Sequence, residues 1–599
     1  MKEYGQRVTG WCLVIFFFLL PLKFGSLAMM PEQPPMFPGD LLTLAVISWP
    51  PHGAGIAGAL LLAASVLFFP APSRRSPGAM TALFWGLLLP LAALPGCLRA
   101  SNWDYAQTAV AHWWGVGSFI LSAWWIFSAD PVWKRRTLHA LAAGVIITGI
   151  DGWRQYIWGF DEMRELIRKQ REAGAVISHV MELRIMDSRV FASLGSCNTF
   201  GGFLLLTIPF VLALAADWGK HFEPVKISRI LFVSVAGILL IGPFLMTRSR
   251  GAWLCGFLTA GLWFFSRSRI GKRCKAVLFL CGILLLCGAF FMMHRSGRGL
   301  LSGTERLDYL RTAAIMSMEH PFAGAGWGEF FHRHMKLKLT GSDESARSPH
   351  NLPGSFASQS GIPAGLIALA ACGVLLFELF RRRPEDPVCR IGRWGILAFL
   401  LHSFMEINDA IPASVICCAA GALALMPENS ADLPAVSGGR CYRWSAALCA
   451  LGVACAGFTA NFLWVRSEAA FEAFELILRP RDLKEFRTPD PGRVMAALAE
   501  VERLRPRSPY AVEMAGDFFF RTGDIENANR LYRASLERVP DRPAAHRRLA
   551  LIACARGDKE LAREHLARAR QIFPADPKSQ EKRFFDEWEQ QEAILLHKR

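Results

Sequence analysis

Apolar runs separated by short polar segments fill most of the chain before residue 466. Many of these runs approach the roughly 20 residues that a helix needs to cross a bilayer. The pattern predicts an all-α fold, with a polytopic bundle of about 12–13 transmembrane helices over residues 1–465. The expected spans lie near residues 11–30, 41–70 (interrupted by WPPHG), 79–98, 107–128, 137–157, 198–217, 229–246, 251–266, 275–293, 355–380, 391–406, 409–426 and 443–465.

Basic residues are concentrated in every second loop between the apolar runs. Lys and Arg total 67 against 50 Asp and Glu, which gives a net charge of +17. Because cytoplasmic loops of membrane proteins are enriched in Lys and Arg, this alternation predicts that these loops and the N-terminus are cytoplasmic. The charge orients the protein and gives no reason to expect a nucleic-acid partner. The basic loops fall at residues 74–75, 134–136, 220–229, 267–275 and 381–393.

The same topology places two longer segments on the outer side, at residues 158–197 and about 294–354. The sequence TRSR, residues 247–250, falls on that side as a hinge between two apolar runs. Because thirteen spans are an odd number and the N-terminus is expected to be cytoplasmic, the C-terminal region is also expected on the outer side.

The composition changes to charged and Ala-rich after residue 465, which predicts a separate C-terminal domain over residues 466–599. Two segments, 522–540 and 556–574, align with six coincident positions, among them Gly523 with Gly557 and Asp524 with Asp558. The two segments are spaced 34 residues apart. A helix–turn–helix unit that repeats every 34 residues is similar to the tetratricopeptide repeat, which stacks helix pairs into a protein-binding surface. A weaker copy ends at Pro506. A generic helical hairpin is the alternative interpretation.

Several polar residues gather in the predicted outer segments and at the edges of the spans that follow them. Arginine in a membrane protein normally faces an interior or an aqueous cavity, and its planar donor fork suits phosphate oxygens. A histidine near arginines stays neutral more readily and can act as a base. Several arginines and one histidine in these segments therefore suggest a lipid-linked phosphate substrate and the abstraction of a proton. The candidate residues are Arg189, Asn198, Arg248, Arg250, Arg306, His350 and Asn351.

Each of these features also has a structural explanation. Arg248 and Arg250 could extend toward the membrane surface, and Asn351 could cap the helix that begins beside it. The glycines of AGAGWGEF, residues 323–330, favour a tight turn over a nucleotide loop. His334 and its neighbours resemble a solvated basic stretch, and the scattered cysteines resemble packing residues. We expect neither a metal nor a cofactor.

The order of four motifs resembles the O-antigen ligase and polymerase superfamily. These motifs are RVFASLGSCN, SRGAW, ERLDYLRTA with HPFAGAGWGEF, and HN before GIPAGL. The resemblance covers roughly residues 10–465. It implies a membrane glycosyltransferase of the bacterial inner membrane that acts at the periplasmic face. Such an enzyme passes a glycan from undecaprenyl pyrophosphate to an acceptor hydroxyl.

The resemblance also implies residue roles. Arg250 and Arg306 match the two arginines that hold the pyrophosphate, and His350 matches the proposed general base. Arg189, Arg248, Asn198 and Asn351 would support substrate binding. Where relatives commonly carry Glu after the HN pair, this chain has Gln359, so Glu406 or Asp409 could supply the missing carboxylate.

Other functions remain open at this point. An O-antigen ligase, a polysaccharide polymerase and a protein O-oligosaccharyltransferase share one donor, so the acceptor can be a lipid, a glycan or a protein. A polytopic transporter would fit the number of spans, although the halves show no internal repeat. A non-catalytic assembly protein would use the repeats to recruit protein partners.

Overall fold

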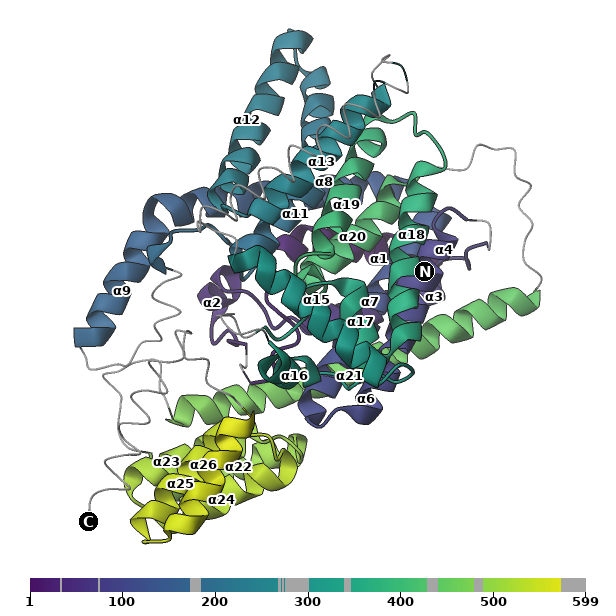
Figure 1. The fold of residues 1–599 in the computed structure, drawn as a ribbon. Coiled ribbons are helices and arrows are strands. Elements are labelled where there is room, and N and C mark those ends of the chain that lie inside the picture. Colours follow the sequence, from purple (N-terminus) through teal and green to yellow (C-terminus); the bar gives the residue numbers. More distant parts are fainter. Residues whose placement is uncertain are drawn as a thin grey trace.

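The computed structural model describes residues 1–32, 35–73, 76–172, 185–267, 271, 274, 301–338, 346–427, 440–478 and 489–572. Throughout this described part the regular elements are helices and no strand is present, which confirms the expected all-α fold. Figure 1 shows a large helical bundle with a smaller group of helices, α22–α26, at one end.

The bundle contains most of the apolar sequence. The first half of its elements are α1 (Lys2–Lys23), α2 (Leu41–Val46), α3 (Gly53–Phe68), α4 (Ala79–Leu83), η1 (Phe84–Leu88), α5 (Leu89–Ala92), α6 (Leu94–Arg99), α7 (Trp103–Ala129), α8 (Val132–Arg154), η2 (Gln155–Gly159) and α9 (Phe160–Glu172). The second half are α11 (Cys197–Trp218), η3 (Gly219–His221), α12 (Val225–Met246), α13 (Arg250–Arg267), α15 (Leu301–Glu319), α16 (Glu329–Leu337), α17 (Leu352–Ser360), α18 (Ile362–Phe380), α19 (Pro387–Ser403), η4 (Asn408–Ala410), α20 (Pro412–Leu425) and α21 (Arg440–Leu478).

Six helical segments of the described chain are long and apolar enough to cross a membrane, fewer than the 12–13 spans expected. Several other expected spans are helical but differ in length or polarity: α13 and α19 have 18 and 17 residues, and α7 and α8 carry polar side chains. The span expected near 41–70 is broken into α2 and α3, and the one near 275–293 lies outside the described residues. The six are Lys2–Lys23, Ala79–Arg99, Cys197–His221, Val225–Met246, Ile362–Phe380 and Cys441–Leu478.

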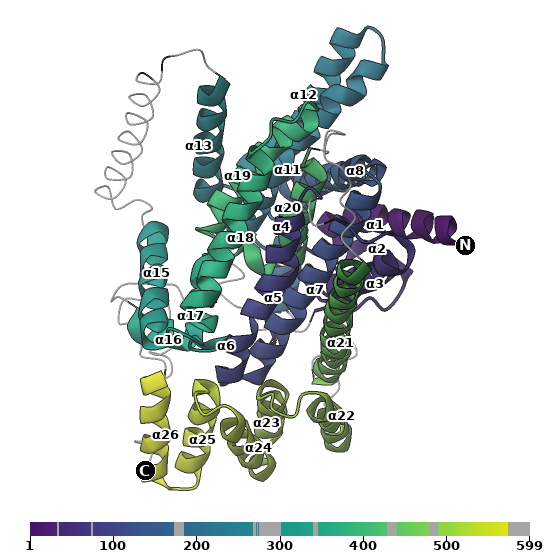
Figure 2. The ribbon, with the colours of Figure 1, turned by 90° about the vertical axis from the view of Figure 1, so that its right-hand side faces the viewer.

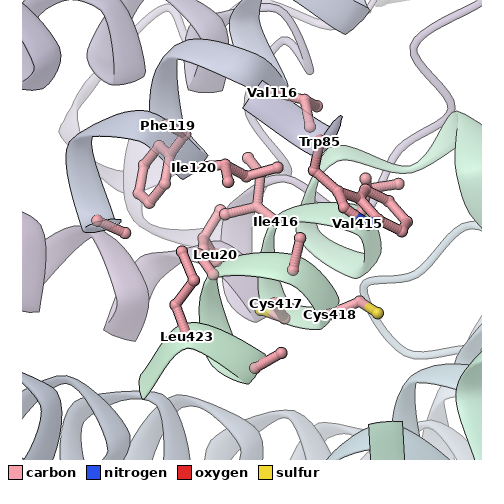
Figure 3. Packing of buried hydrophobic residues seen from close by; sticks show 14 of the residues in the cluster. Leu20, Trp85, Val116, Phe119, Ile120, Val415, Ile416, Cys417, Cys418 and Leu423 are labelled. Carbon is pink, nitrogen blue, oxygen red and sulfur yellow. The ribbon is translucent and has the colours of Figure 1, made fainter. Parts of the chain in front are cut away.

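Helix α20 lies at the centre of the bundle, packed against α1, α7, α8, α18 and α19. Every residue of α20 is buried, although its 14 residues are too few to cross a bilayer. Figure 3 shows Ile416, Cys417 and Cys418 of this helix among side chains from α1, η1 and α7. Helices in a membrane gain little from the hydrophobic effect, so association depends on close van der Waals contact between small side chains. The Ala- and Cys-rich sequence of α20 provides that contact.

Basic loops meet at the end of the bundle where α8 begins. Arg135 forms ion pairs with Asp217, near the end of α11, and with Asp386, at the start of α19. Lys134 donates to the carbonyl oxygen of Met426 at 3.2 Å. Three loops that are far apart in sequence therefore lie together, as the alternation of basic loops predicts.

The C-terminal helices form a compact repeat domain at the opposite end of the bundle from the tips of α12 and α13 (Figure 1). Gly523 and Gly557 both adopt positive φ, at 87° and 82°, and each ends one helix of a pair. Asp524 and Asp558 then accept hydrogen bonds from backbone amides at the start of the next helix. The predicted repeat is thus a pair of matching helix–turn–helix units. Its helices are α22 (Pro491–Leu504), α23 (Tyr510–Thr522), α24 (Ile525–Arg538), α25 (Pro543–Ala555) and α26 (Lys559–Ile572).

The long helix α21 connects the bundle to the repeat domain. It passes through the expected boundary at residue 465 without a break, and its last turns contribute Phe471, Phe474 and Leu478 to the core of the repeat domain. Figure 2 shows α22–α26 side by side, with α6 and α16 above them. We call the end of the bundle that faces these helices the repeat end.

Arg505 joins the repeat domain to this end of the bundle. It is 2% exposed, and its guanidinium lies 3.9 Å from the ring centroid of Trp464. It donates to Ser467 Oγ at 2.8 Å and to the carbonyl oxygen of Pro31 at 3.3 Å. Burial lowers the pKa of Arg505, and the nearby carboxyl groups of Asp104 and Glu468 oppose that shift. A cation held this way ties three segments together.

We expect Arg505→Leu to destabilise the packing of the repeat domain on the bundle. Removing one partner from a buried charged cluster costs about 3–5 kcal/mol, because the remaining groups stay desolvated. Thermal unfolding of the purified full chain, followed by tryptophan fluorescence, should show a clearly lower midpoint. Arg503→Ala is the matched control, since Arg503 forms an exposed pair with Glu500 worth about 1 kcal/mol or less. Equal midpoints for the two variants would contradict a role for Arg505 in docking.

Candidate functional site

The hinge, residues 247–250, reverses the chain between α12 and α13. Thr247 is buried, and its hydroxyl donates to the carbonyl oxygen of Phe244 at 2.7 Å while accepting from the Ser249 amide at 3.2 Å. Arg248 adopts a left-handed φ of 49°, which completes the reversal. Arg250 is then the first residue of α13 and is exposed.

Arg189 holds the segment before α11 against this hinge. Its Nε donates to the carbonyl oxygen of Thr247 at 3.0 Å, and its Nη2 donates to Asn198 Oδ1 at 2.9 Å and to the carbonyl oxygen of Arg248 at 3.3 Å. Arg248 lies 3.8 Å from a carboxylate oxygen of Asp187. The structure therefore brings Arg189, Asn198 and Arg248 together around the hinge.

A second group of predicted residues meets where α15 and α17 pack together at the repeat end. Arg306 on α15 donates from Nη2 to Glu406 Oε2 at 2.7 Å and from Nε to the carbonyl oxygen of Met405 at 2.7 Å. His350 precedes α17, and its Nδ1 lies 3.4 Å from Glu406 Oε1. Glu406 is 3% exposed, so one buried carboxylate lies between the arginine and the histidine.

The distance from His350 to Glu406 is longer than a good hydrogen bond, for which a nitrogen and an oxygen lie 2.7–3.2 Å apart. Catalytic hydrogen bonds are often long in a site without substrate and shorten when it binds. The ring of His350 also lies 5.2 Å from the ring of Tyr309, centroid to centroid. A small movement of the imidazole would let Nδ1 donate a hydrogen bond to Glu406 Oε1 and leave Nε2 available to a ligand.

Asn351 anchors the histidine segment from its other side. Its Oδ1 accepts from the Gly354 amide at 2.7 Å, which makes it the N-cap of α17, and its Nδ2 donates to the carbonyl oxygen of Phe404 at 2.9 Å. The capping interpretation of Asn351 is therefore confirmed. The same side chain also fixes His350 relative to the segment that carries Glu406.

Residues 402–406 link the two groups. The end of this segment accepts hydrogen bonds from Arg306 and Asn351 and lies beside His350, while its start, His402, lies beside the hinge. A methyl group added at Gly251 would lie 3.7 Å from Nε2 of His402. His402 is 1% exposed and belongs to the last turn of α19.

The two consecutive glycines of α11 make this arrangement possible. A methyl group at Gly202 would lie 2.5 Å from Nδ1 of His402, and one at Gly201 would lie 3.2 Å from Cβ of Ser249 in the hinge. Any side chain at Gly202 would displace His402. The glycine pair therefore lets the hinge and residues 402–406 approach the same turn of α11.

Backbone strain is concentrated in this region. Among the described residues, four that are not glycine have positive φ: Ser188, Ala192, Arg248 and His350. Two of them flank Arg189, and the other two are candidate residues themselves. Strained φ values cost about 1–3 kcal/mol each and persist where the surrounding structure enforces them, commonly at functional sites.

Gln359, where the resemblance implies Glu, packs against the glycine-rich turn. It is 4% exposed, and its Oε1 accepts from the Gly328 amide at 2.9 Å. Gly324, Gly326 and Gly328 all adopt positive φ, so AGAGWGEF forms the expected tight turn. Gln359 fixes that turn, while Glu406 is the carboxylate beside His350.

His334 differs from the expected solvated stretch. It is 0% exposed, and its ring stacks on Phe330 and meets Tyr309 edge-on at a centroid distance of 5.0 Å. The helix α16 is amphipathic, with Phe330, His334 and Met335 buried on one face. Because His334 packs beneath Tyr309, it supports the ring that contacts His350.

Sequence reasoning missed His402, Gly201, Gly202 and Tyr309. The signal for His402 was present: HSFMEIND places histidine, glutamate, asparagine and aspartate within eight residues at the end of an apolar run. Asp409 lies in the same stretch and is 4% exposed, and its buried Oδ1 has no hydrogen-bond partner among the described residues. In that same part of the chain, no group of three or more His, Cys, Asp and Glu side chains is placed to hold a metal ion.

Two parts of the chain match family models of known proteins. Residues 235–369, which include the hinge, α15 and the His350 segment, match the family model of O-antigen ligase. Residues 513–577 match the tetratricopeptide repeat model. No curated protein matches the chain. The chain is therefore an O-antigen ligase-like membrane protein with a C-terminal tetratricopeptide repeat.

Proposed function

We propose that this protein transfers a glycan from undecaprenyl pyrophosphate to an acceptor hydroxyl at the periplasmic face of the bacterial inner membrane. The observation that carries the proposal is the cluster of Arg306, Glu406 and His350. It places a fixed cation and a histidine that can take up a proton on one buried carboxylate. The match to O-antigen ligase supports the reaction class.

In the proposed reaction, the acceptor oxygen attacks the anomeric carbon of the donor glycan. Nε2 of His350 takes the hydroxyl proton, and Glu406 stabilises the imidazolium that forms. The bond between the anomeric carbon and the phosphate oxygen breaks, and its electron pair leaves with undecaprenyl pyrophosphate. Arg250 and Arg306 stabilise the negative charge that develops on that leaving group.

The repeat domain lies at the same end of the bundle as His350. Its position is relevant to which acceptor the protein uses. Lys336 on α16 lies 3.6 Å from a carboxylate oxygen of Asp541 in the repeat domain, and α16 also contacts α26. A tetratricopeptide surface beside the site favours a protein partner, so a protein acceptor stands as a second candidate beside lipid A-core and a second lipid-linked glycan.

His350→Ala should reduce transfer by about 100-fold or more, the usual contribution of a positioned general base. The assay uses the full chain in nanodiscs, an undecaprenyl-pyrophosphate-linked glycan, and lipid A-core, a second lipid-linked unit or periplasmic protein as acceptor. His221→Ala, an exposed histidine in η3, is the control. Unchanged transfer by His350→Ala would exclude His350 as the base, and the acceptor used by the wild type identifies the branch.

Glu406→Gln should lower kcat by at least about tenfold while changing KM for the donor less. The amide keeps the size of the side chain but loses the charge that stabilises the imidazolium, and each 1.4 kcal/mol lost from the transition state slows the reaction tenfold. Glu319→Gln, which alters a half-exposed pair with Arg333, is the matched control. Equal kcat values in both variants would mean that Glu406 has only a structural role.

Arg250→Ala should raise KM for the donor and lower kcat together, because the guanidinium would act on the pyrophosphate in both the ground state and the transition state. Arg250→Lys should recover only part of this loss, since an ammonium group lacks the bidentate fork. Arg248→Ala, next to it in the hinge, is the control and should have a smaller effect. If Arg248→Ala proved more damaging than Arg250→Ala, the assignment within the hinge would be reversed.

A further inference from the structure

The hydrogen bonds around His402 determine which of its ring nitrogens carries the proton. The hydroxyl of Ser403 donates to the carbonyl oxygen of Phe399 at 2.9 Å, so its oxygen is left to accept. It accepts from Nδ2 of Asn408 at 3.0 Å, which fixes the orientation of that amide. The other proton of Nδ2 is directed at Nδ1 of His402, also 3.0 Å away. Nδ1 is therefore the acceptor, and the proton of the neutral ring is on Nε2.

The protonated Nε2 is aimed at the hinge. The edge of the ring formed by Nε2 and Cδ2 faces Gly251, and a methyl group there would lie 3.7 Å from both atoms. Nε2 forms no hydrogen bond within the described chain, although the residue is 1% exposed. The ring is thus largely enclosed, and its N–H has a fixed orientation but no protein acceptor in this part of the chain, so a ligand that reaches Nε2 gains a preoriented hydrogen-bond donor.

The start of α13 supplies further donors at the same place. Helix α13 has 18 residues, and the backbone amides of Gly251 and Ala252 have no hydrogen-bond acceptor among the described residues. The first amides of a helix, with the positive end of its dipole, bind phosphate groups. Arg250 begins this helix, and Arg189 and Arg248 lie in and beside the hinge that precedes it. Negative charge is thus favoured where Nε2 of His402 points.

We propose that Nε2 of His402 donates a hydrogen bond to a phosphate oxygen of the lipid-pyrophosphate donor, seated at the start of α13. This role rests on the proposed function and extends it, because it adds a neutral donor from α19 to the arginines of the hinge. Gly202 and Asn408 are then positioning residues: the first leaves room for the ring, and the second fixes its tautomer.

The test compares two amide substitutions at this position. The amide of His402→Gln reaches the place of Nε2 and keeps a donor there, whereas the shorter amide of His402→Asn reaches only the place of Nδ1. Both variants keep a polar side chain of similar character, so the comparison isolates the donor facing the hinge. Equilibrium binding of undecaprenyl pyrophosphate and of inorganic pyrophosphate is measured on the full chain in nanodiscs, with undecaprenyl alcohol as the ligand without phosphate.

We expect His402→Asn to weaken binding of both pyrophosphate ligands on the order of 10- to 100-fold, the range for a hydrogen bond to a charged group. His402→Gln should retain most of the affinity, and binding of undecaprenyl alcohol should be the same in both variants. Thermal midpoints are recorded in parallel. A loss of affinity for the alcohol as well would identify a structural role and overturn the proposal.

Arg250→Ala separates this proposal from the proposed function. If His402→Asn binds pyrophosphate like the wild type while Arg250→Ala does not, His402 is not part of the site and the glycosyltransferase assignment stands. If the wild type itself binds neither pyrophosphate ligand, the pyrophosphate site fails, and both the proposed function and the role of His402 fail with it.

Discussion

The candidate site depends on a buried carboxylate. Glu406 lies at the edge of an apolar bundle with 3% of its surface exposed, and an ionised carboxylate in such a place costs several kcal/mol unless it is paired. Arg306 supplies the pairing at 2.7 Å, and His350 lies within 3.4 Å. Because these partners come from α15 and from the segment before α17, neutralising Glu406 also fixes both of these segments on the bundle. A stabilising contact and a proposed catalytic one are therefore the same interaction.

Close packing of helices α11, α13 and α19 brings the hinge near the segment that carries Glu406. In a membrane, small residues let helices approach, and α11 has two glycines at the turn where it meets both the hinge and His402. The hinge is then near enough to α19 for residues 402–406 to contact it at one end and His350 at the other. Arg189 closes the arrangement by donating to the hinge carbonyl groups. Arg189, Arg248 and Arg306 each donate to a backbone oxygen and also lie beside a carboxylate.

The sequence predicts much of this organisation because the relevant patterns are local. Apolar runs predict the helices, and the spacing of Gly523 and Gly557 predicts the matching repeats. It could not predict which groups meet. The sequence offers two carboxylates, Glu406 and Asp409, as neighbours of His350, and only the fold of the turn after α19 brings Glu406 beside it. Likewise, the sequence predicts a solvated His334 because Lys336 and Lys338 follow it closely, whereas the helical periodicity of α16 buries it against Tyr309.

The position of the repeat domain also depends on a buried charged residue, Arg505, and it places the domain near the candidate site. Arg505 fixes the domain by its contact with Trp464 and its bond to Pro31, so the domain is held against the repeat end rather than tethered loosely by α21. Arg347, which lies three residues before His350 in the chain, forms an ion pair with Glu32. The repeat domain itself contacts α16, which packs on α17 beside the segment that carries the proposed base. Such proximity raises the effective concentration of a bound acceptor without any contact to the reacting groups. Under the proposed function, recruitment and catalysis would be separable: substitutions on the repeats would change which acceptor is used, whereas those at His350 or Glu406 would change the rate for every acceptor.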